Sequence, residues 1–212
     1  MNNPIYHFCK SPIDFILAFF LVCMLSPIFI FVGLLIFFDL GRPIFFKQKR
    51  GGLNENPFYI IKFKTMKNSN NKNINIKDDK RRTSNLGRIL RKYSIDEIPS
   101  LINILKGEMS LVGPRPLLFE YHKLYNVHQK KRFLVKPGIT GWAQVNGRNA
   151  ISWEEKFKFD IWYIKNRSFI VDFKILLKTI FKVFNNEDVN SNKNDTMSKF
   201  EGNEGSEGNE DN

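Results

Sequence analysis

The sequence predicts an α+β protein that is mostly helical. We expect a re-entrant membrane helix at the N-terminus, then a small β-hairpin, then amphipathic interfacial helices around a compact domain. Three observations support this prediction. Residues 15–38 contain no charged side chain, residues 43–64 hold two strand-like runs around a turn-rich loop, and residues 86–184 repeat apolar positions at helical spacing.

Composition limits the class of protein. The chain has 212 residues, enough for one domain with a hydrophobic core, and a formal net charge of +12. Such a basic chain attracts anionic partners: nucleic acid, an anionic membrane or a phosphorylated substrate. Cys9 and Cys23 are too few for a disulfide framework, and the three histidines lack zinc-ligand spacing. A bound metal would therefore take oxygen ligands.

The uncharged run at residues 15–38 is long enough to cross a bilayer as a straight helix, which is its simplest interpretation. Two features favour a bent, re-entrant helix instead. Pro27 removes the N–H that would bond the carbonyl of Cys23, and the hydroxyl of Ser26 is placed to satisfy that carbonyl. Basic residues flank both ends, although a span prefers them on one side; they are Lys10 before the run and Arg42, Lys47, Lys49 and Arg50 after it. We therefore expect a break at Ser26 and Pro27, with both ends on one membrane face.

A hairpin is predicted next. Residues 43–49 and 58–64 have strand-like patterns, and a loop rich in glycine and asparagine joins them. Lys62 and Lys64 are expected to alternate outward from the second strand. Residues 67–83 are rich in Asn, Lys and Asp and lack apolar periodicity, which predicts a solvated loop.

Two adjacent carboxylates, Asp96 and Glu97, lie in a basic stretch at the expected start of a helix. Either Ser94 and Glu97 form a capping box, or Asp96 is the cap and Pro99 lies in the first turn. The plain interpretation of the two acids is a cap that complements the helix dipole. A helix start also suits a bound phosphate.

Two helices are expected around this pair. Residues 86–93 keep helical spacing, and Arg88 and Arg91 lie off the apolar face, where they can reach the carboxylates. A rigid segment at residues 113–116 precedes a helix predicted over residues 117–133.

The C-terminal half leaves two alternatives open. Residues 136–149 are dense in glycine and polar side chains, so they form either a ligand-binding loop, with Arg148 on a phosphate, or an ordinary surface loop. Residues 153–166 predict a helix with Asp160 off its apolar stripe. Residues 168–184 form an amphipathic helix that either lies on an anionic membrane surface or packs into the core.

The carboxylate pair and the surrounding arginines indicate a chemistry. Two acids would repel a phosphate unless a divalent cation lies between them. A carboxylate, a hard cation and guanidinium donors together suit phosphoryl transfer, and the apolar anchor indicates that one substrate is a lipid phosphate. The alternative is a catalytically silent membrane-surface module that binds anionic lipid or polymer. Nucleic-acid binding is not expected, because no nucleic-acid motif accompanies the apolar run.

Several long motifs, in order, resemble the small monotopic phosphoglycosyl transferases, the bacterial sugar transferase family. The resemblance covers residues 10–184. Besides the break at Ser26 and Pro27, the motifs are FKQKRG at residues 46–51, KFKTM at 62–66, LRKYSIDEIP at 90–99, LKGEMSLVGPRP at 105–116 and KPGITGWAQVNGR at 136–148.

The resemblance implies transfer of a sugar 1-phosphate from a UDP-sugar to polyprenyl (undecaprenyl) phosphate, with release of UMP and Mg²⁺ as the cofactor. It implies that Asp96 is the nucleophile, forms a covalent phosphosugar intermediate and holds the metal. Glu97 would assist with the metal or with proton removal from the acceptor. The positions that match substrate-binding residues are Lys62, Arg91, Arg115, Arg148 and Asp160.

We expect three parts: a re-entrant anchor at residues 1–40, a catalytic domain at residues 41–186 and a disordered acidic tail at residues 187–212. The chain resembles the minimal form of the family, because few residues precede the anchor. The family implies a monotopic protein of the bacterial inner (cytoplasmic) membrane, with its catalytic domain on the cytoplasmic face. It would act at the first membrane step of surface polysaccharide or glycoprotein glycan assembly. Anionic membrane lipid is an expected partner; the sugar and a homodimer stay open.

Overall fold

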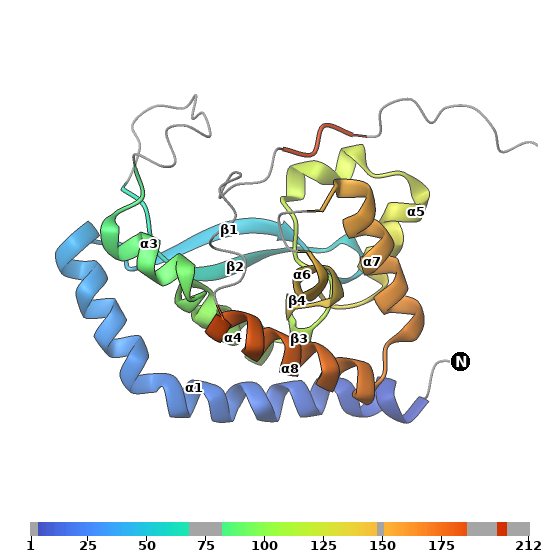
Figure 1. Cartoon of the computed structure of the whole chain (residues 1–212), viewed down its shortest axis with the longest axis horizontal. Helices are drawn as coiled ribbons and strands as arrows, with labels where there is room; N and C mark the ends of the chain where they lie inside the picture. The colour runs from blue at the N-terminus through green and yellow to red at the C-terminus, as the bar shows by residue number, and fades with distance from the viewer. Residues whose placement is uncertain (1–3, 68–81, 148–150, 186–198, 203–212) are drawn as a thin grey trace, which may run out of the picture.

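The computed structural model describes residues 4–67, 82–147, 151–185 and 199–202. The protein is mostly helical, as predicted, and the long helix α1 (Pro4–Leu40) runs along one side of a body formed by the other elements (Figure 1). With η for 3-10 helices, these are β1 (Phe45–Gly51), η1 (Leu53–Glu55), β2 (Pro57–Phe63), α3 (Asn85–Lys92), η2 (Ile95–Ser100), α4 (Leu101–Leu105), β3 (Ser110–Val112), η3 (Phe119–Leu124), α5 (Val127–Lys130), η4 (Lys131–Leu134), β4 (Gly138–Thr140), α6 (Trp142–Asn146), α7 (Trp153–Asn166) and α8 (Phe169–Asn185).

Helix α1 is bent into two arms without losing its helical continuity (Figure 1). Pro27 lies inside it and has no N–H to offer the carbonyl of Cys23. The hydroxyl of Ser26 donates to that carbonyl at 2.8 Å, as the sequence predicts. Ser26 thus satisfies the polar group that Pro27 leaves free in an apolar run.

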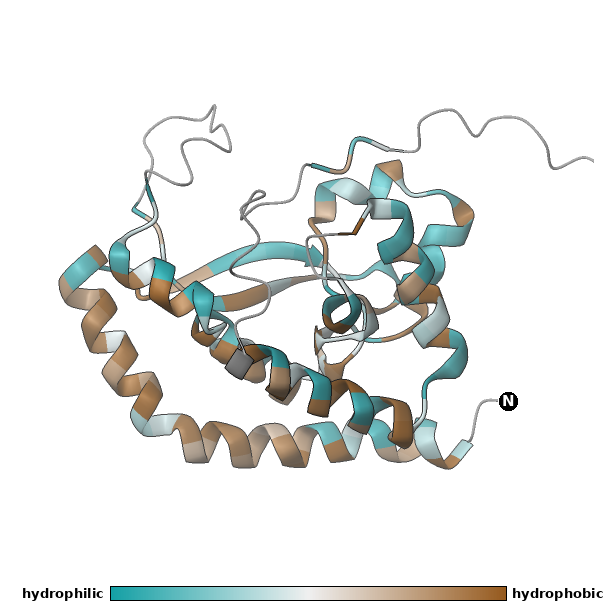
Figure 2. Ribbon diagram, in the orientation of Figure 1, coloured by the Kyte–Doolittle hydropathy of each residue, from teal (hydrophilic) through white to brown (hydrophobic). Residues whose placement is uncertain are grey.

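Most apolar side chains of α1 are exposed, and the ribbon of this helix is coloured as hydrophobic along most of its length (Figure 2). Phe38, for example, keeps 82% of its surface exposed. The helix is long and apolar enough to cross a membrane. An apolar surface of this extent is unfavourable in water and indicates a membrane protein.

Residues on both sides of Pro27 rest on the same body. Before it, Ala18 is buried in the main core against α4 and its neighbours. After it, Val32 and Ile36 pack with Phe63 of β2 and Leu90 of α3. Both arms of α1 are therefore held by one body.

The predicted hairpin is present. Strands β1 and β2 pair antiparallel, with Phe45 opposite Phe63 and Gly51 opposite Pro57. The outward orientation predicted for Lys62 and Lys64 is wrong. Lys64 is only 6% exposed and donates to the carbonyl of Leu40 at 3.1 Å, and Lys62 is turned toward η2. The reason is that both faces of β2 are covered, by η2 and by α1.

The segment at residues 117–133, predicted as one helix, is divided into η3, α5 and η4. A capping box between Asn126 and Gln129 starts α5 and explains the interruption. The segment at residues 136–149 contains β4 and α6, which the sequence did not reveal. Strand β4 pairs parallel with β3, and Gly138 is required there because a Cβ would collide with the backbone nitrogen of Gly113.

Helices α7 and α8 form as predicted. A capping box between Ser152 and Glu155 starts α7. In α8, Ile175 and Asp172 face the body and are buried, whereas apolar side chains on the other side are exposed, Phe173 by 62%. The core-packing alternative therefore applies only to the narrow face of α8 that carries Ile175.

Part of the C-terminal tail is packed on the body. Phe200 is 5% exposed and lies among the rings of Tyr121, Tyr125, Trp153 and Phe157. Of residues 187–212, the structure describes only 199–202, so the predicted disorder of the remainder is outside the described residues. The loop predicted at residues 67–83 is likewise described only at its ends.

Candidate active site

A change of helix type positions the carboxylate pair. Helix α3 ends at Lys92, and Ser94 adopts a left-handed backbone with φ of 55°, uncommon for serine. This turn leads into η2, whose first turn contains Asp96 and Glu97. Ser94 occupies the N-cap position of η2 but makes no side-chain cap hydrogen bond, so the predicted capping box is absent; the alternative, Asp96 as the cap, is wrong because Asp96 lies inside η2. The acids do lie at a helix start, but of a short 3-10 helix.

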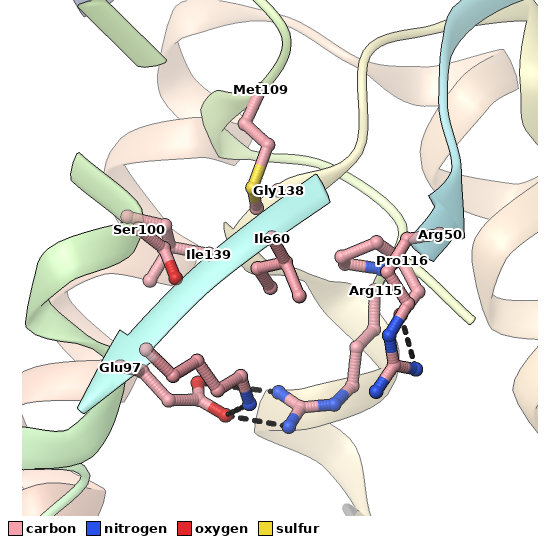
Figure 3. Close-up of a pocket in the computed structure, with 10 residues that line it drawn as sticks. Arg50, Ile60, Glu97, Ser100, Met109, Arg115, Pro116, Gly138 and Ile139 are labelled. Carbon is pink, nitrogen blue, oxygen red and sulfur yellow. Dashed lines mark hydrogen bonds and ion pairs between the residues drawn. The ribbon is translucent and has the colours of Figure 1, made fainter. Parts of the chain in front are cut away.

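Glu97 is held by two cations from different elements (Figure 3). Its Oε1 accepts a hydrogen bond from Lys62 of β2 at 2.7 Å and one from Nη2 of Arg115 at 2.6 Å. Arg115 follows β3, and its Nη1 also donates to Oε2 at 3.4 Å. The fold thus brings Glu97, Lys62 and Arg115 together, with geometry close to a bidentate pair between arginine and carboxylate.

The two carboxyl groups have different acidities. Burial and the neighbouring charge of Glu97 raise the pKa of Asp96 to about 6, despite the opposing effect of Lys62. Burial acts in the same direction on Glu97, but Arg115 and Lys62 outweigh it and hold the pKa of Glu97 well below its usual range. At neutral pH both groups are mainly ionised, and Asp96 is the more basic of the two.

Arg91 approaches Asp96 from α3. Its Nε donates to the hydroxyl of Thr65 at 2.9 Å, and its charge acts to lower the pKa of Asp96. Arg91 is therefore within electrostatic range of Asp96, and its substrate-binding role stays a prediction. Arg148, predicted for the same role, lies outside the described residues.

Asp160 does not line the pocket at Glu97. It forms a buried ion pair with Arg132, at 3.0 Å between Oδ2 and Nη2. The same Nη2 of Arg132 donates to the backbone carbonyl of Arg115 at 2.6 Å. Asp160 is thus linked to the pair indirectly, through Arg132 and the backbone that carries the Arg115 side chain.

A narrow pocket opens beside Glu97. Its charged lining consists of Arg50, Lys62 and Arg115 against Glu97, so positive charge is in excess. Arg50 donates to the carbonyl of Pro116 at 3.1 Å, yet its buried Nε has no hydrogen-bond partner among the described residues. Burial and Arg115 lower the pKa of Arg50 to about 10. An unpaired guanidinium nitrogen among excess cations suits an anionic ligand.

The sequence did not single out Arg50 or Arg132. Arg50 stands in a basic stretch before a glycine turn, and Arg132 follows two lysines. Both resemble the many exposed basic residues of the chain. Arg132 is buried beside Tyr125 and Phe157, and only the three-dimensional packing reveals this.

The carboxylates limit how a metal would bind. Among the described residues, no group of three or more His, Cys, Asp or Glu side chains is placed to hold a metal ion. Asp96 is the carboxylate of the pair that is not clamped by Lys62 and Arg115. Mg²⁺ commonly takes one or two carboxylates and completes its shell with substrate phosphates and water. One unclamped carboxylate is compatible with this mode of binding, and Asp96 is the residue that would hold such an ion.

Comparison with known proteins gives consistent matches. The family model described as bacterial sugar transferase matches residues 5–186. The uncharacterized sugar transferase EpsL of Bacillus subtilis (strain 168) is 48% identical over 193 residues, which cover 91% of this chain and 96% of EpsL.

Two further relatives have names that state a reaction. The UDP-glucose:undecaprenyl-phosphate glucose-1-phosphate transferase of Escherichia coli (strain K12) is 35% identical, over 84% of this chain and 40% of that protein. The UDP-N-acetylgalactosamine-undecaprenyl-phosphate N-acetylgalactosaminephosphotransferase of Aeromonas hydrophila is 35% identical, over 85% of this chain and 44% of that protein. This chain thus spans less than half the length of these two relatives, but nearly all of EpsL.

Proposed function

Because the chain belongs to the bacterial sugar transferase family, we propose that it transfers a sugar 1-phosphate from a UDP-sugar to undecaprenyl phosphate. The products are UMP and an undecaprenyl-diphosphate sugar, the first membrane-bound intermediate of a surface polysaccharide or glycoprotein glycan. Two relatives are named for transfer of this kind. The structural observation that supports the proposal most is the basic pocket in which Lys62 and Arg115 neutralise Glu97, together with the raised pKa of the adjacent Asp96.

In the first step, a carboxylate oxygen of Asp96 attacks the sugar-bearing phosphorus of the donor. A new O–P bond forms, the bond from that phosphorus to the bridging diphosphate oxygen breaks, and UMP leaves with the electron pair. The sugar 1-phosphate is then covalently attached to Asp96. The raised pKa of Asp96, about 6, suits this role, because the group is more nucleophilic than an ordinary carboxylate and is still ionised near neutral pH.

The cations neutralise the charge of the donor. Arg50, Lys62 and Arg115 line one pocket, and fixed cations stabilise charge that develops on phosphate oxygens during transfer. Glu97 orients two of them through its ion pairs. Since its pKa is well below the usual range, Glu97 is a poor proton acceptor, so we assign it to positioning Lys62 and Arg115.

In the second step, a phosphate oxygen of undecaprenyl phosphate attacks the phosphorus held on Asp96. The bond between phosphorus and the Asp96 oxygen breaks, and the free carboxylate returns. Mg²⁺, when bound, would neutralise part of the diphosphate charge, and Asp96 is the residue that would hold it.

We propose that α1 enters one leaflet and returns, so that the body lies on the cytoplasmic face of the inner membrane. The support is that residues before and after Pro27 pack on one body, which a straight span does not allow. The exposed apolar face of α8, with Phe173 and Phe181, would rest on the same membrane surface.

Release of UMP tests the proposed function. Purified protein is incubated with undecaprenyl phosphate, Mg²⁺ and a panel of UDP-sugars, and UMP is measured. We expect release with at least one donor, dependent on the acceptor and on Asp96. No release with any donor, from protein that remains folded, would instead favour a silent membrane-surface module.

A further inference from the structure

A second cavity lies between α1 and the turn after α4, apart from the candidate active site. Its volume is about 360 Å³, and it is lined by Ser11, Pro12, Asp14 and Phe15 of α1, by residues 104–107 and Met109, and by Lys136. Neither Asp96 nor Glu97 lines it. The buried side chain of Met109 contributes to the walls of both cavities, so the two are neighbours with separate linings.

Two lysines give this cavity a positive charge. Lys106 is exposed at the end of α4, and Lys136 reaches across to α1, where its Nζ donates to the hydroxyl of Ser11 at 3.2 Å. Among the described residues, neither amine is paired with a carboxylate. Both remain available to an anion.

The acidic residue in the wall does not neutralise these lysines. One oxygen of Asp14 accepts a hydrogen bond from Lys10 at 2.8 Å, and the other accepts one from the hydroxyl of Ser110 at 2.5 Å. The carboxylate is buried and hydrogen-bonded on both oxygens, and Lys10, which also pairs with Asp172 at 2.9 Å, compensates part of its charge.

The cavity also lies where α1 changes from polar to apolar. Ser11 and Asp14 are polar, whereas Phe15 begins the uncharged run and is half exposed. If α1 enters the bilayer as proposed, this boundary is at the level of the lipid headgroups. An occupant with a phosphate near the lysines would have its hydrocarbon beside Phe15.

We propose that this cavity binds one anionic phospholipid of the membrane. The phosphate interacts with Lys106 and Lys136, and the acyl chains extend along Phe15 and the exposed apolar side chains that follow it on α1. The lipid acceptor is a different ligand, because Glu97, Lys62 and Arg115, which line the candidate active site, do not line this cavity. The proposal rests on the proposed membrane placement of α1 and is independent of the transfer reaction.

Native mass spectrometry of the full-length protein, released from detergent micelles, tests this site. The protein is mixed with phosphatidylglycerol or phosphatidylcholine, without sugar donor, and bound lipid is counted. We expect one retained phosphatidylglycerol. In Lys106→Gln/Lys136→Gln we expect its affinity to fall by about 10- to 30-fold, since each lysine near an anionic headgroup contributes on the order of 1 kcal/mol.

Two matched variants serve as controls. Lys106→Arg/Lys136→Arg keeps both charges and should retain the lipid, which separates loss of charge from loss of folding. Lys123→Gln/Lys131→Gln removes the same charge from η3 and η4, which do not line the cavity, and should also retain it.

Other outcomes overturn the proposal. These are equal retention of phosphatidylcholine, unchanged affinity in Lys106→Gln/Lys136→Gln, and displacement of the lipid by millimolar inorganic phosphate alone. Lysine-dependent binding of undecaprenyl phosphate in preference to phosphatidylglycerol would assign the cavity to the acceptor instead. Because no sugar donor is present, failure here leaves the UMP-release result unaffected, and the reverse holds as well.

Discussion

Asp96 and Glu97 are adjacent in the chain, yet the pKa values of their carboxyl groups are shifted in opposite directions. In the pocket, Lys62 and Arg115 both donate hydrogen bonds to Glu97, and neither donates one to Asp96. The carboxylate of Glu97 is thus bound by the two cations, and the neighbouring carboxylate of Asp96 keeps a higher proton affinity. Pairs of titratable groups with divergent pKa values are typical of functional sites.

The pH dependence of the reaction follows from this division. A carboxylate nucleophile must be ionised, and the pKa of Asp96 is raised to about 6. We therefore expect kcat/KM to rise with pH through an apparent pKa near this value and to level off above it. Initial rates of UMP release between acid and neutral pH check this. A profile that is flat across this range would contradict the assignment.

Substitution Glu97→Gln should change both the rate and the pH profile. Removing the charge of Glu97 ends its repulsion of Asp96 and frees Lys62 and Arg115 to stabilise the Asp96 carboxylate. The acid limb should therefore move to lower pH, while kcat falls because the two cations lose their orientation. Glu120→Gln, at an exposed position of η3, is the matched control and should leave the profile unchanged. An unshifted acid limb in Glu97→Gln would argue against electrostatic coupling of the pair.

Arg132→Ala should destabilise the protein strongly. It leaves the buried carboxylate of Asp160 without its cation and the carbonyl of Arg115 without its donor. Breaking a buried ion pair from one side typically costs about 3–5 kcal/mol. Denaturant unfolding in detergent measures the change, with the exposed neighbour Lys131→Ala as the control. A loss comparable to that of the control would show that the pair is not structurally important.

Phe200→Ala should release the described part of the tail. Phe200 packs on the ring of Trp153 at 5.3 Å between centroids, so its removal should expose Trp153 and move its fluorescence to longer wavelength. Because the segment can undock locally, we expect a global unfolding free energy lower by no more than about 1 kcal/mol. A Trp153→Phe variant is measured alongside, and the difference between its emission and that of the parent gives the contribution of Trp153. No shift attributable to Trp153 would contradict the packing of Phe200.

Pro27→Ala should favour a straight, spanning α1, because alanine restores the N–H that bonds the carbonyl of Cys23. Ile5→Cys, in a background with Cys9 and Cys23 replaced by serine, reports the position of the N-terminus with a membrane-impermeant thiol reagent. We expect labelling from the cytoplasmic side in the parent and increased labelling from the opposite side in Pro27→Ala. Cytoplasmic access alone in both proteins would count against the role of Pro27.

Local sequence patterns were sufficient for several elements. The hairpin, α3, α7 and α8 follow from strand-like runs around a turn-rich loop and from helical periodicity, which are patterns of neighbouring residues. The hydrogen bond from Ser26 to the carbonyl of Cys23 is equally local. Long-range pairing was not predicted. Strands β3 and β4 have three residues each, too few to show alternation, and they come together from distant parts of the chain.

The candidate site was also predicted only in part, because contacts between distant parts of the chain form it. Motif resemblance indicated Asp96, Glu97, Lys62 and Arg115, and the structure brings the last three into contact. The carboxylates lie in the short 3-10 helix η2, which packs against β2, and neither the capping box nor the Asp96 cap forms there. In a chain with 33 lysines and arginines, the ion pairs with Glu97 distinguish Lys62 and Arg115, and these pairs form only in the folded protein.

Covalent trapping at Asp96 tests the central claim most directly. The enzyme is mixed with a UDP-sugar that supports UMP release, without lipid acceptor, and quenched with acid, and its peptides are analysed by mass spectrometry, with Asp96→Asn as the control. We predict a sugar phosphate on the peptide that contains Asp96, absent from Asp96→Asn and lost when undecaprenyl phosphate is added before the quench. An enzyme that turns over under these conditions but carries no adduct at Asp96 would contradict the proposed mechanism.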